Sequence, residues 1–108
     1  MKYKLGDILK MSWGYDQTNV DFFEVTKLVG KTMIEIRKVA NKIVRGAGEP
    51  QEFVVPVPGE YLTWDPEFAK PLRKKPNAEG RVKIYSWGAG AYPWNGKPAY
   101  KTGAMWGH

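Results

Sequence analysis

The sequence predicts a mainly β fold, either a small β-barrel or a rolled antiparallel sheet of the SH3-like or OB-like kind, with at most one short helix. Several short runs alternate apolar and polar residues, which is the period of half-buried strands. Glycine and proline, with 12 and 8 residues, interrupt those runs. Only one short segment resembles a helix start, so helices contribute little. We expect a single β-rich domain over residues 1–108.

The first strand is predicted from its alternation. Residues 7–13 place Leu9, Met11 and Trp13 on one face at period two. The residues that follow, up to Asn19, are polar and typical of a turn. We therefore expect a strand that buries its odd-numbered side chains, followed by a wide connection.

A hairpin is predicted next. Residues 20–29 are rich in β-branched and aromatic side chains, and Gly30-Lys31 separates them from a similar run over residues 32–39. Two connecting residues with glycine first favour a type II′ turn. Residues 40–45 fit either one helical turn or a continuation of the strand.

The middle of the chain holds one more strand and the only helix signal. Residues 53–57 alternate, and Pro56 within them indicates an edge position or the end of the strand. Residues 65–67, with the sequence Asp-Pro-Glu, have the form of a helix start. Pro71 limits that helix to about one turn.

The strand predicted over residues 81–87 is the most informative for function. Its alternation separates apolar side chains on one face from cations and aromatic rings on the other. The second face consists of Arg81, Lys83, Tyr85 and Trp87. Further along, Asn95-Gly96 predicts a tight turn because both residue types tolerate positive φ.

Positive charge is concentrated in the last third of the chain. Residues 70–108 contain eight basic residues against one acid, Glu79, a net charge of +7, whereas residues 1–69 have a net charge of −1. Aromatic residues are interspersed with these cations. Cations attract phosphates, and flat rings stack bases at about 1–3 kcal/mol per base. The combination predicts a binder of nucleotides or nucleic acid. The alternative is that the rings form a core and the lysines keep the surface hydrated.

Three kinds of side chain are predicted to contact the ligand. The aromatic residues expected to stack a base are Trp13, Tyr15, Trp87, Tyr92 and Trp94. The cations expected to neutralise phosphate are Arg73, Lys75, Arg81, Lys83 and Lys97. The polar residues expected to bind the edge of the base or ribose are Gln17, Thr18 and Asn19. Turn formation alone accounts for the last three residue types equally well.

Catalysis has little support. The chain has no cysteine, and its one histidine is the last residue, His108. The usual nucleophile–base pairs therefore cannot be assembled, and no glycine motif for phosphate binding is present. A pI near 9.6 excludes an acidic mimic of DNA. We expect a non-enzymatic, soluble protein with no catalytic residue, metal, cofactor or membrane partner.

The run over residues 12–25, SWGYDQTNVDFFEV, resembles a family of small uncharacterised proteins carried by bacteriophages and plasmids. The resemblance continues through residues 55–56, 71–74, 84–86 and 92–98, and so covers most of the chain. The resemblance implies that the chain is an accessory protein of a mobile element in the bacterial cytoplasm. It implies no activity and no ligand. Proteins of that sort often counter host defence, some by binding cyclic nucleotide signals before immune effectors detect them.

Three hypotheses follow. The first is a non-enzymatic, phage-type protein that binds and sequesters a phosphate-bearing nucleotide, for example a cyclic nucleotide signal of anti-phage defence, in a pocket that a homo-oligomer would help to enclose. The alternative is a small-barrel module that holds single-stranded RNA or DNA along an open basic face. The second alternative is a protein–protein inhibitor of a host defence factor, which would use the aromatic residues as a contact surface.

Overall fold

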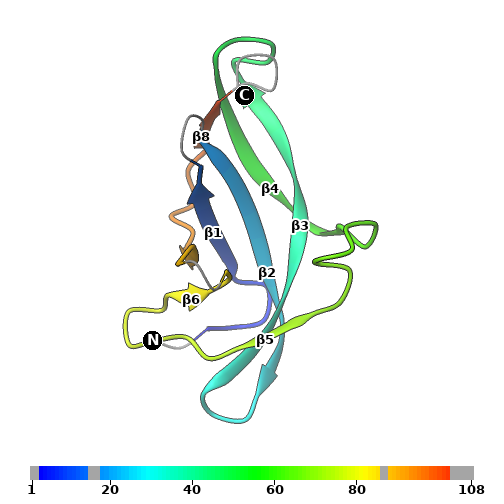
Figure 1. The fold of residues 1–108 in the computed structure, drawn as a ribbon, viewed down its shortest axis with the longest axis vertical. Helices are drawn as coiled ribbons and strands as arrows, with labels where there is room; N and C mark the ends of the chain where they lie inside the picture. Colours follow the sequence, from blue (N-terminus) through cyan, green and yellow to red (C-terminus); the bar gives the residue numbers. More distant parts are fainter. Residues whose placement is uncertain (1–2, 15–17, 86–87, 103–108) are drawn as a thin grey trace.

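The alternating runs form one antiparallel sheet, which the computed structural model describes over residues 3–14, 18–85 and 88–102 (Figure 1). No helix forms within those ranges. The eight strands are β1 (Ile8–Trp13), β2 (Asn19–Val29), β3 (Met33–Arg45), β4 (Gln51–Tyr61), β5 (Leu72–Lys74), β6 (Val82–Lys83), β7 (Gly90–Pro93) and β8 (Ala99–Thr102). The prediction of a mainly β fold is confirmed.

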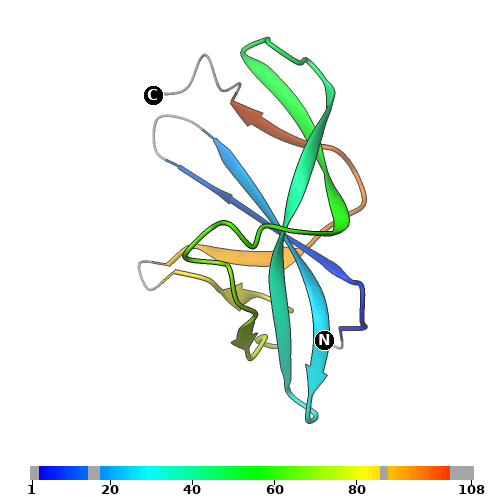
Figure 2. The same cartoon turned by 90° about the vertical axis from the view of Figure 1, so that its right-hand side faces the viewer.

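The sheet is rolled and is not closed into a barrel. Its strand order is β6-β7-β1-β2-β3-β4-β8, and β5 pairs with β3 outside this path. The long strand β3 has two partners on the edge opposite β2, because residues 34–36 pair with β5 and residues 39–45 pair with β4. Figure 2 shows β3 running along the molecule, with β4 beside its upper half. The rolled sheet is confirmed, and the closed barrel is wrong because β6 and β8 remain the two ends of the order.

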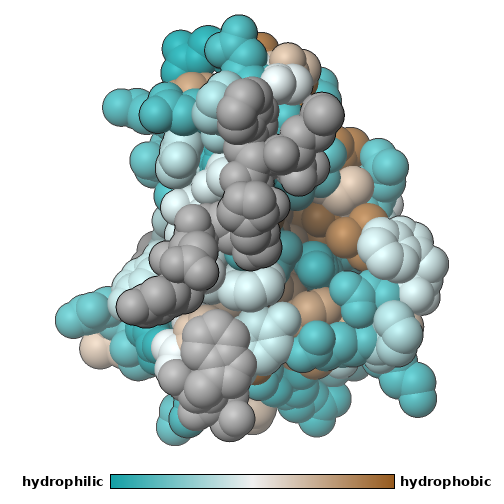
Figure 3. All heavy atoms as spheres, turned by 45° about the horizontal axis from the view of Figure 1, so that its top comes forward, coloured by the Kyte–Doolittle hydropathy of each residue, from teal (hydrophilic) through white to brown (hydrophobic). Residues whose placement is uncertain are grey.

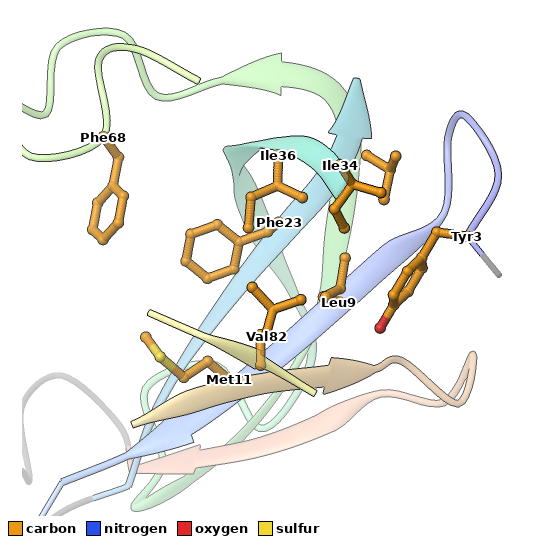
Figure 4. Packing of buried hydrophobic residues seen from close by; sticks show 10 residues of the cluster. Tyr3, Leu9, Met11, Phe23, Ile34, Ile36, Phe68 and Val82 are labelled. Carbon is orange, nitrogen blue, oxygen red and sulfur yellow. The ribbon is translucent and has the colours of Figure 1, made fainter. Parts of the chain in front are cut away.

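Both faces of the sheet are covered. Phe22 and Phe23 are consecutive in β2 and are both fully buried, so they must point to opposite faces. Phe23 belongs to the first core cluster, which also contains Leu9, Met11 and Ile36 and is drawn in Figure 4. The second cluster surrounds Phe22 and consists of Val20, Phe22, Val39, Val54 and Ala99. Since β2 and β3 contribute to both clusters, the described residues form one folded unit.

Hydrogen bonds connect one end of the sheet to its centre. The backbone N–H of Thr102, at the end of β8, donates to the carbonyl of Thr18 at 2.9 Å. The N–H of Thr18 donates to Thr102 Oγ1, also at 2.9 Å. These contacts fold β8 toward the start of β2 over the second core cluster.

The predicted hairpin forms with a longer turn than expected. Val29 pairs with Met33, so the connection contains three residues and not two. Gly30 has the positive φ of +60° that motivated the turn prediction. Residues 40–45 continue β3, which resolves the choice between a helical turn and a strand.

The fourth strand is longer than predicted. Residues 56–59 do not end it, because β4 extends to Tyr61 and its pairing with β3 continues past Pro56. The expectation of an edge position for Pro56 is confirmed, since β8 pairs only with residues 51–54. Pro56 therefore has a paired neighbour only in β3, where it lies opposite Asn41.

The Asp-Pro-Glu segment makes the contact of a helix cap without a helix. Asp65 Oδ1 accepts a hydrogen bond from the N–H of Glu67 at 3.0 Å, as expected of a capping aspartate. The chain then turns so that Phe68, 4% exposed, packs into the first core cluster. Its ring lies 5.5 Å from that of Phe23, edge to face. The N–H of Phe68 donates to the carbonyl of Asp65 at 3.1 Å, so the segment forms one hydrogen-bonded turn and no helix.

The strand predicted over residues 81–87 is much shorter in the structure. Only Val82 and Lys83 form β6, with Val82 fully buried and Lys83 exposed, as the alternation predicts. The N–H groups of Ile84 and Tyr85 both donate to the carbonyl of Ala89, at 3.0 and 3.1 Å. The chain therefore turns after β6, and the predicted continuous face of cations and rings is interrupted.

Candidate functional site: a basic groove between β5 and β6

Two strand edges face each other across an open groove. Among the described strands, β5 pairs only with β3 and β6 only with β7, although the two lie near each other in the lower parts of Figures 1 and 2. The space between them has a volume of ≈ 480 Å³. We call it the basic groove, defined by its lining residues Arg73, Lys74, Lys75, Lys83, Ile84 and Tyr85. Four of these six are cations, and none is a carboxylate.

Arg73 is positioned by the register of β5 on β3. This register places Arg73 opposite Glu35, and its Nη2 and Nε donate to Glu35 Oε2 at 2.9 and 3.3 Å. The Arg73 side chain is still 56% exposed. A guanidinium has five N–H donors, so N–H groups remain for an anion in the groove. The ion pair orients the side chain without satisfying all of its donors.

The three lysines supply charge that no acid compensates. Lys75 and Lys83 are exposed and Lys74 is half-buried. Within the described part of the chain, none of the three forms an ion pair. Like charges held in one groove focus a positive potential and attract anions. The groove is therefore suited electrostatically to a ligand with more than one negative charge.

Tyr85 provides the aromatic wall of the groove. Its ring is half-buried and contacts Trp13 at 6.4 Å and Phe68 at 6.3 Å between centroids, both edge to face. Burial raises the pKa of Tyr85 above its ordinary value of 10.0, and the nearby carboxylate of Glu67 raises it further. The phenol is therefore neutral at physiological pH and adds no negative charge to the groove.

A polar network fixes the rings behind Tyr85. Trp13 Nε1 donates to Asp21 Oδ2 at 2.9 Å. Lys38 Nζ lies 3.4 Å from both Asp21 Oδ1 and Asp65 Oδ2, and 4.8 Å from the centroid of the Phe68 ring. The cation lies between two carboxylates that would otherwise repel each other and any anion nearby. This network connects Trp13 and Phe68, the two rings that contact Tyr85.

The structure brings three of the predicted ligand residues together, namely Arg73, Lys75 and Lys83. Sequence reasoning missed the three other lining residues, Lys74, Ile84 and Tyr85. Lys74 could have been found because it lies between two predicted residues, and Tyr85 because it alternates with Lys83. Trp13 supports Tyr85 from behind and does not line the groove.

Arg81, which was predicted to contact phosphate, does not line the groove and instead makes hydrogen bonds within the protein. Its Nη2 donates to the carbonyl of Gly88, and its backbone N–H donates to Asn77 Oδ1 at 2.9 Å. A Cβ built on Gly90 would lie 2.6 Å from Arg81 Nε, so glycine leaves room for this side chain. Arg81 thus connects the two arms of the β6–β7 hairpin.

Three other predicted residues lie outside the groove, on β7 and the turn that follows. Trp94 packs edge to face on Phe22 at 5.8 Å, and its Nε1 donates to the carbonyl of Lys97 at 2.8 Å. The predicted Asn-Gly turn forms with a positive φ at Gly96 only. Tyr92, 48% exposed, lines a separate small groove of ≈ 330 Å³.

The polar residues predicted to bind the base edge are only partly described. Thr18 is hydrogen-bonded to Thr102, and Asn19 pairs with Trp13 in the β1–β2 ladder. Neither lines the basic groove. Tyr15, Gln17 and Trp87 lie outside the described residues.

The described residues contain no group of three or more His, Cys, Asp or Glu side chains placed to hold a metal ion. They also include no helix of the length and apolar character needed to cross a membrane. A scan against protein-family models, a search of curated proteins and a search of solved structures found no match to this chain. Function must therefore be inferred from the groove itself.

Proposed function

We propose that this protein is a non-enzymatic nucleotide-binding protein that holds the phosphates of its ligand in the basic groove. The main support is that four cations from β5, β6 and the residue after β5 line one groove that no carboxylate lines. Arg73 offers a planar fork suited to two phosphate oxygens, and the lysines act as point charges. These cations should bind a phosphate group more strongly than a single carboxylate group.

The groove offers less to the base than to the phosphates. Tyr85 is the one aromatic residue among its lining residues. Enclosure of a small nucleotide requires several rings and polar groups to converge around the ligand, whereas Trp94 and Tyr92 lie elsewhere. Sequestration of a cyclic nucleotide signal, the phage context and a pocket shared between copies of the chain remain predictions.

The proposal can be tested with matched charge reversals. Binding would be measured for cyclic dinucleotides, ADP-ribose derivatives and short oligonucleotides, by thermal shift and by equilibrium titration at two salt concentrations. Lys83→Glu should weaken binding about tenfold or more, because it removes a cation and adds a repelling charge. Lys97→Glu makes the same charge change outside the groove and should stay within about twofold of the original affinity.

Two results would contradict the proposal. One is equal loss of affinity in Lys83→Glu and Lys97→Glu, which would mean that net charge and not the groove determines binding. The other is an absence of binding across the whole panel, which would favour the protein–protein inhibitor. A saturating ligand at 100 times its Kd stabilises a fold by about 2.7 kcal/mol, so the thermal shift would not be missed.

One observation favours that second alternative. Trp64 is 76% exposed, the most exposed of the large hydrophobic residues described, and tryptophan is enriched in protein contacts. On the face drawn in Figure 3, hydrophobic residues lie among hydrophilic ones. The nucleotide proposal has the support of four cations that line one groove, whereas the protein–protein alternative rests on one exposed indole.

A further inference from the structure

A second groove adjoins the basic groove at Lys75. It has a volume of ≈ 700 Å³ and lies between the tip of the β2–β3 hairpin and the chain after β5. We call it the hairpin groove, and its principal lining residues are Tyr3, Leu28, Lys31, Met33, Lys75 and Asn77. Because Lys75 lines both grooves, the two grooves meet at this residue.

The hairpin groove shares the sign of its charge with the basic groove, although fewer cations line it. Lys31, exposed at the hairpin tip, supplies a cation at its far end, and no residue that lines it is a carboxylate. Leu28, 46% exposed, and Met33 provide apolar surface on one wall. A cation beside an apolar wall suits a phosphate and the face of the base next to it.

The loop between the two grooves is held in place. The Tyr3 hydroxyl donates to the carbonyl of Gly80, and Asn77 Oδ1 accepts hydrogen bonds from the N–H groups of Glu79 and Arg81, both at 2.9 Å. Lys75 therefore stands on a chain segment that is fixed on both sides, by β5 before it and by this turn after it. Its position between the grooves does not need to be formed on binding.

We infer that the ligand is an extended single strand of nucleic acid, whose successive phosphates occupy the basic groove and then the hairpin groove. This inference rests on the proposed function and specifies its ligand class. Five cations, Arg73, Lys74, Lys75, Lys83 and Lys31, line the combined path. A mononucleotide has its phosphates at one point and leaves cations at the other end without a partner, whereas a phosphodiester chain repeats its charge along the path.

The experiment compares ligand lengths in two charge variants. Fluorescence anisotropy would be measured with labelled oligothymidylates from the dinucleotide to the dodecanucleotide, as DNA and as the corresponding RNA. Affinity should rise by about tenfold or more from the dinucleotide to the octanucleotide and then level off as the path is filled. Lys83→Glu should weaken every length.

Lys31→Glu distinguishes the inference from the proposed function. It should weaken the octanucleotide about fivefold and leave the dinucleotide within about twofold. It should also reduce the slope of log affinity against log salt by about 0.7 for each lost phosphate contact. Lys31 is exposed in a turn, so an unchanged melting temperature would show that the fold is intact. Lys97→Glu is again the control and should change none of these quantities.

Several outcomes would overturn the inference. If affinity does not depend on length, or if Lys31→Glu behaves like Lys97→Glu at every length, the ligand is confined to the basic groove and only the proposed function survives. If a polyglutamate peptide binds as tightly as the octanucleotide and with the same dependence on Lys31, the path recognises charge and not a phosphodiester chain. If no nucleotide or oligonucleotide binds, the proposed function fails as well.

Discussion

Two regions of the last third of the chain combine lysine with aromatic residues, yet the structure uses them differently. Residues 72–85 include β5 and β6, and their cations line the basic groove together with Tyr85. Residues 92–97 include the end of β7 and a tight turn, and there Trp94 packs against the second core cluster. The same residue types therefore line a groove in one region and form a turn in the other.

The difference has a physical cause. In the second region the chain reverses within four residues, so the Trp94 indole can reach the carbonyl of Lys97 and stabilise the turn that contains both. In the first region the cations lie on two short strands, separated by residues 75–81, that do not pair with each other. Two strands without a hydrogen-bonded ladder between them leave a groove, whereas the tight turn of the second region closes on itself.

The largest expected effect is that of Trp94→Ala on stability. Removing a half-buried indole that contacts Phe22 leaves a cavity and an unpaired carbonyl at Lys97, and should cost about 2–4 kcal/mol. The measurement is urea unfolding monitored by fluorescence of the remaining tryptophans. Tyr92→Ala, which removes an exposed ring from the preceding strand β7, is the control and should cost well under about 1 kcal/mol.

The same variant tests whether residues 92–97 contact the ligand. Nucleotide affinity of Trp94→Ala, measured well below its melting temperature, should match that of the original protein. If Trp94→Ala keeps its stability and loses affinity, the indole is a ligand contact, and residues 92–97 belong to the binding site after all.

Most of the fold could be predicted because its strands show a clear period. Leu9 and Met11 are both buried on the face that alternation assigned to them. What could not be predicted depends on contacts between distant segments. Nothing in the local sequence indicates that β3 has two partners on one edge, or that Phe68 packs on Phe23 in place of a helical turn.

The sequence predicted which types of residue line the candidate site, but it did not predict which individual residues do so. The cluster around Arg73 predicted a phosphate contact on charge alone, and the structure adds Lys83 to it from a different strand. Lys31 was not selected because it lies in the N-terminal part of the chain, where acids balance the basic residues. Only the tertiary arrangement brings the hairpin tip next to Lys75.

The next effect in size is a loss of stability at high pH through Tyr3. Burial, with the nearby Asp7 carboxylate, raises the pKa of Tyr3 from 10.0 to about 12. The folded state therefore retains the phenol proton that the unfolded state releases, so the stabilisation is fully present below pH 10 and is lost as the pH rises toward about 12. The total loss should be about 2–3 kcal/mol.

Tyr3→Phe tests the first of the two regions alone. The Tyr3 hydroxyl donates to the carbonyl of Gly80, in the connection between β5 and β6, and makes no such bond to the turn at residues 92–97. Urea unfolding at a series of alkaline pH values should give a shallower pH dependence for this variant than for the original protein. An unchanged dependence would assign the alkaline loss to other tyrosines, such as Tyr61 and Tyr85, whose pKa values are also raised.

A smaller effect is expected for Arg81→Ala. The guanidinium donates to the carbonyl of Gly88 across the β6–β7 hairpin, and a partly exposed bond of this kind contributes about 1 kcal/mol. The variant should lose that stability and retain most of its affinity for oligonucleotides, in contrast with Lys83→Ala. A large loss of affinity in Arg81→Ala without loss of stability would return Arg81 to the ligand site that the sequence predicted.

The smallest effect is a gain of affinity on removing the acid that competes for Arg73. Glu35 Oε2 accepts hydrogen bonds from Nε and Nη2 of this guanidinium, and ion pairs with one exposed partner contribute only about 0.2–1 kcal/mol to stability. Glu35→Gln should therefore leave the fold nearly unchanged and strengthen oligonucleotide binding about two- to threefold, because the released fork and the lost negative charge both favour phosphate. Glu49→Gln, in the exposed β3–β4 turn, makes the same change in net charge and should have no effect beyond experimental error. Equal gains in both variants would mean that the overall charge, and not the geometry at Arg73, determines the affinity of the groove.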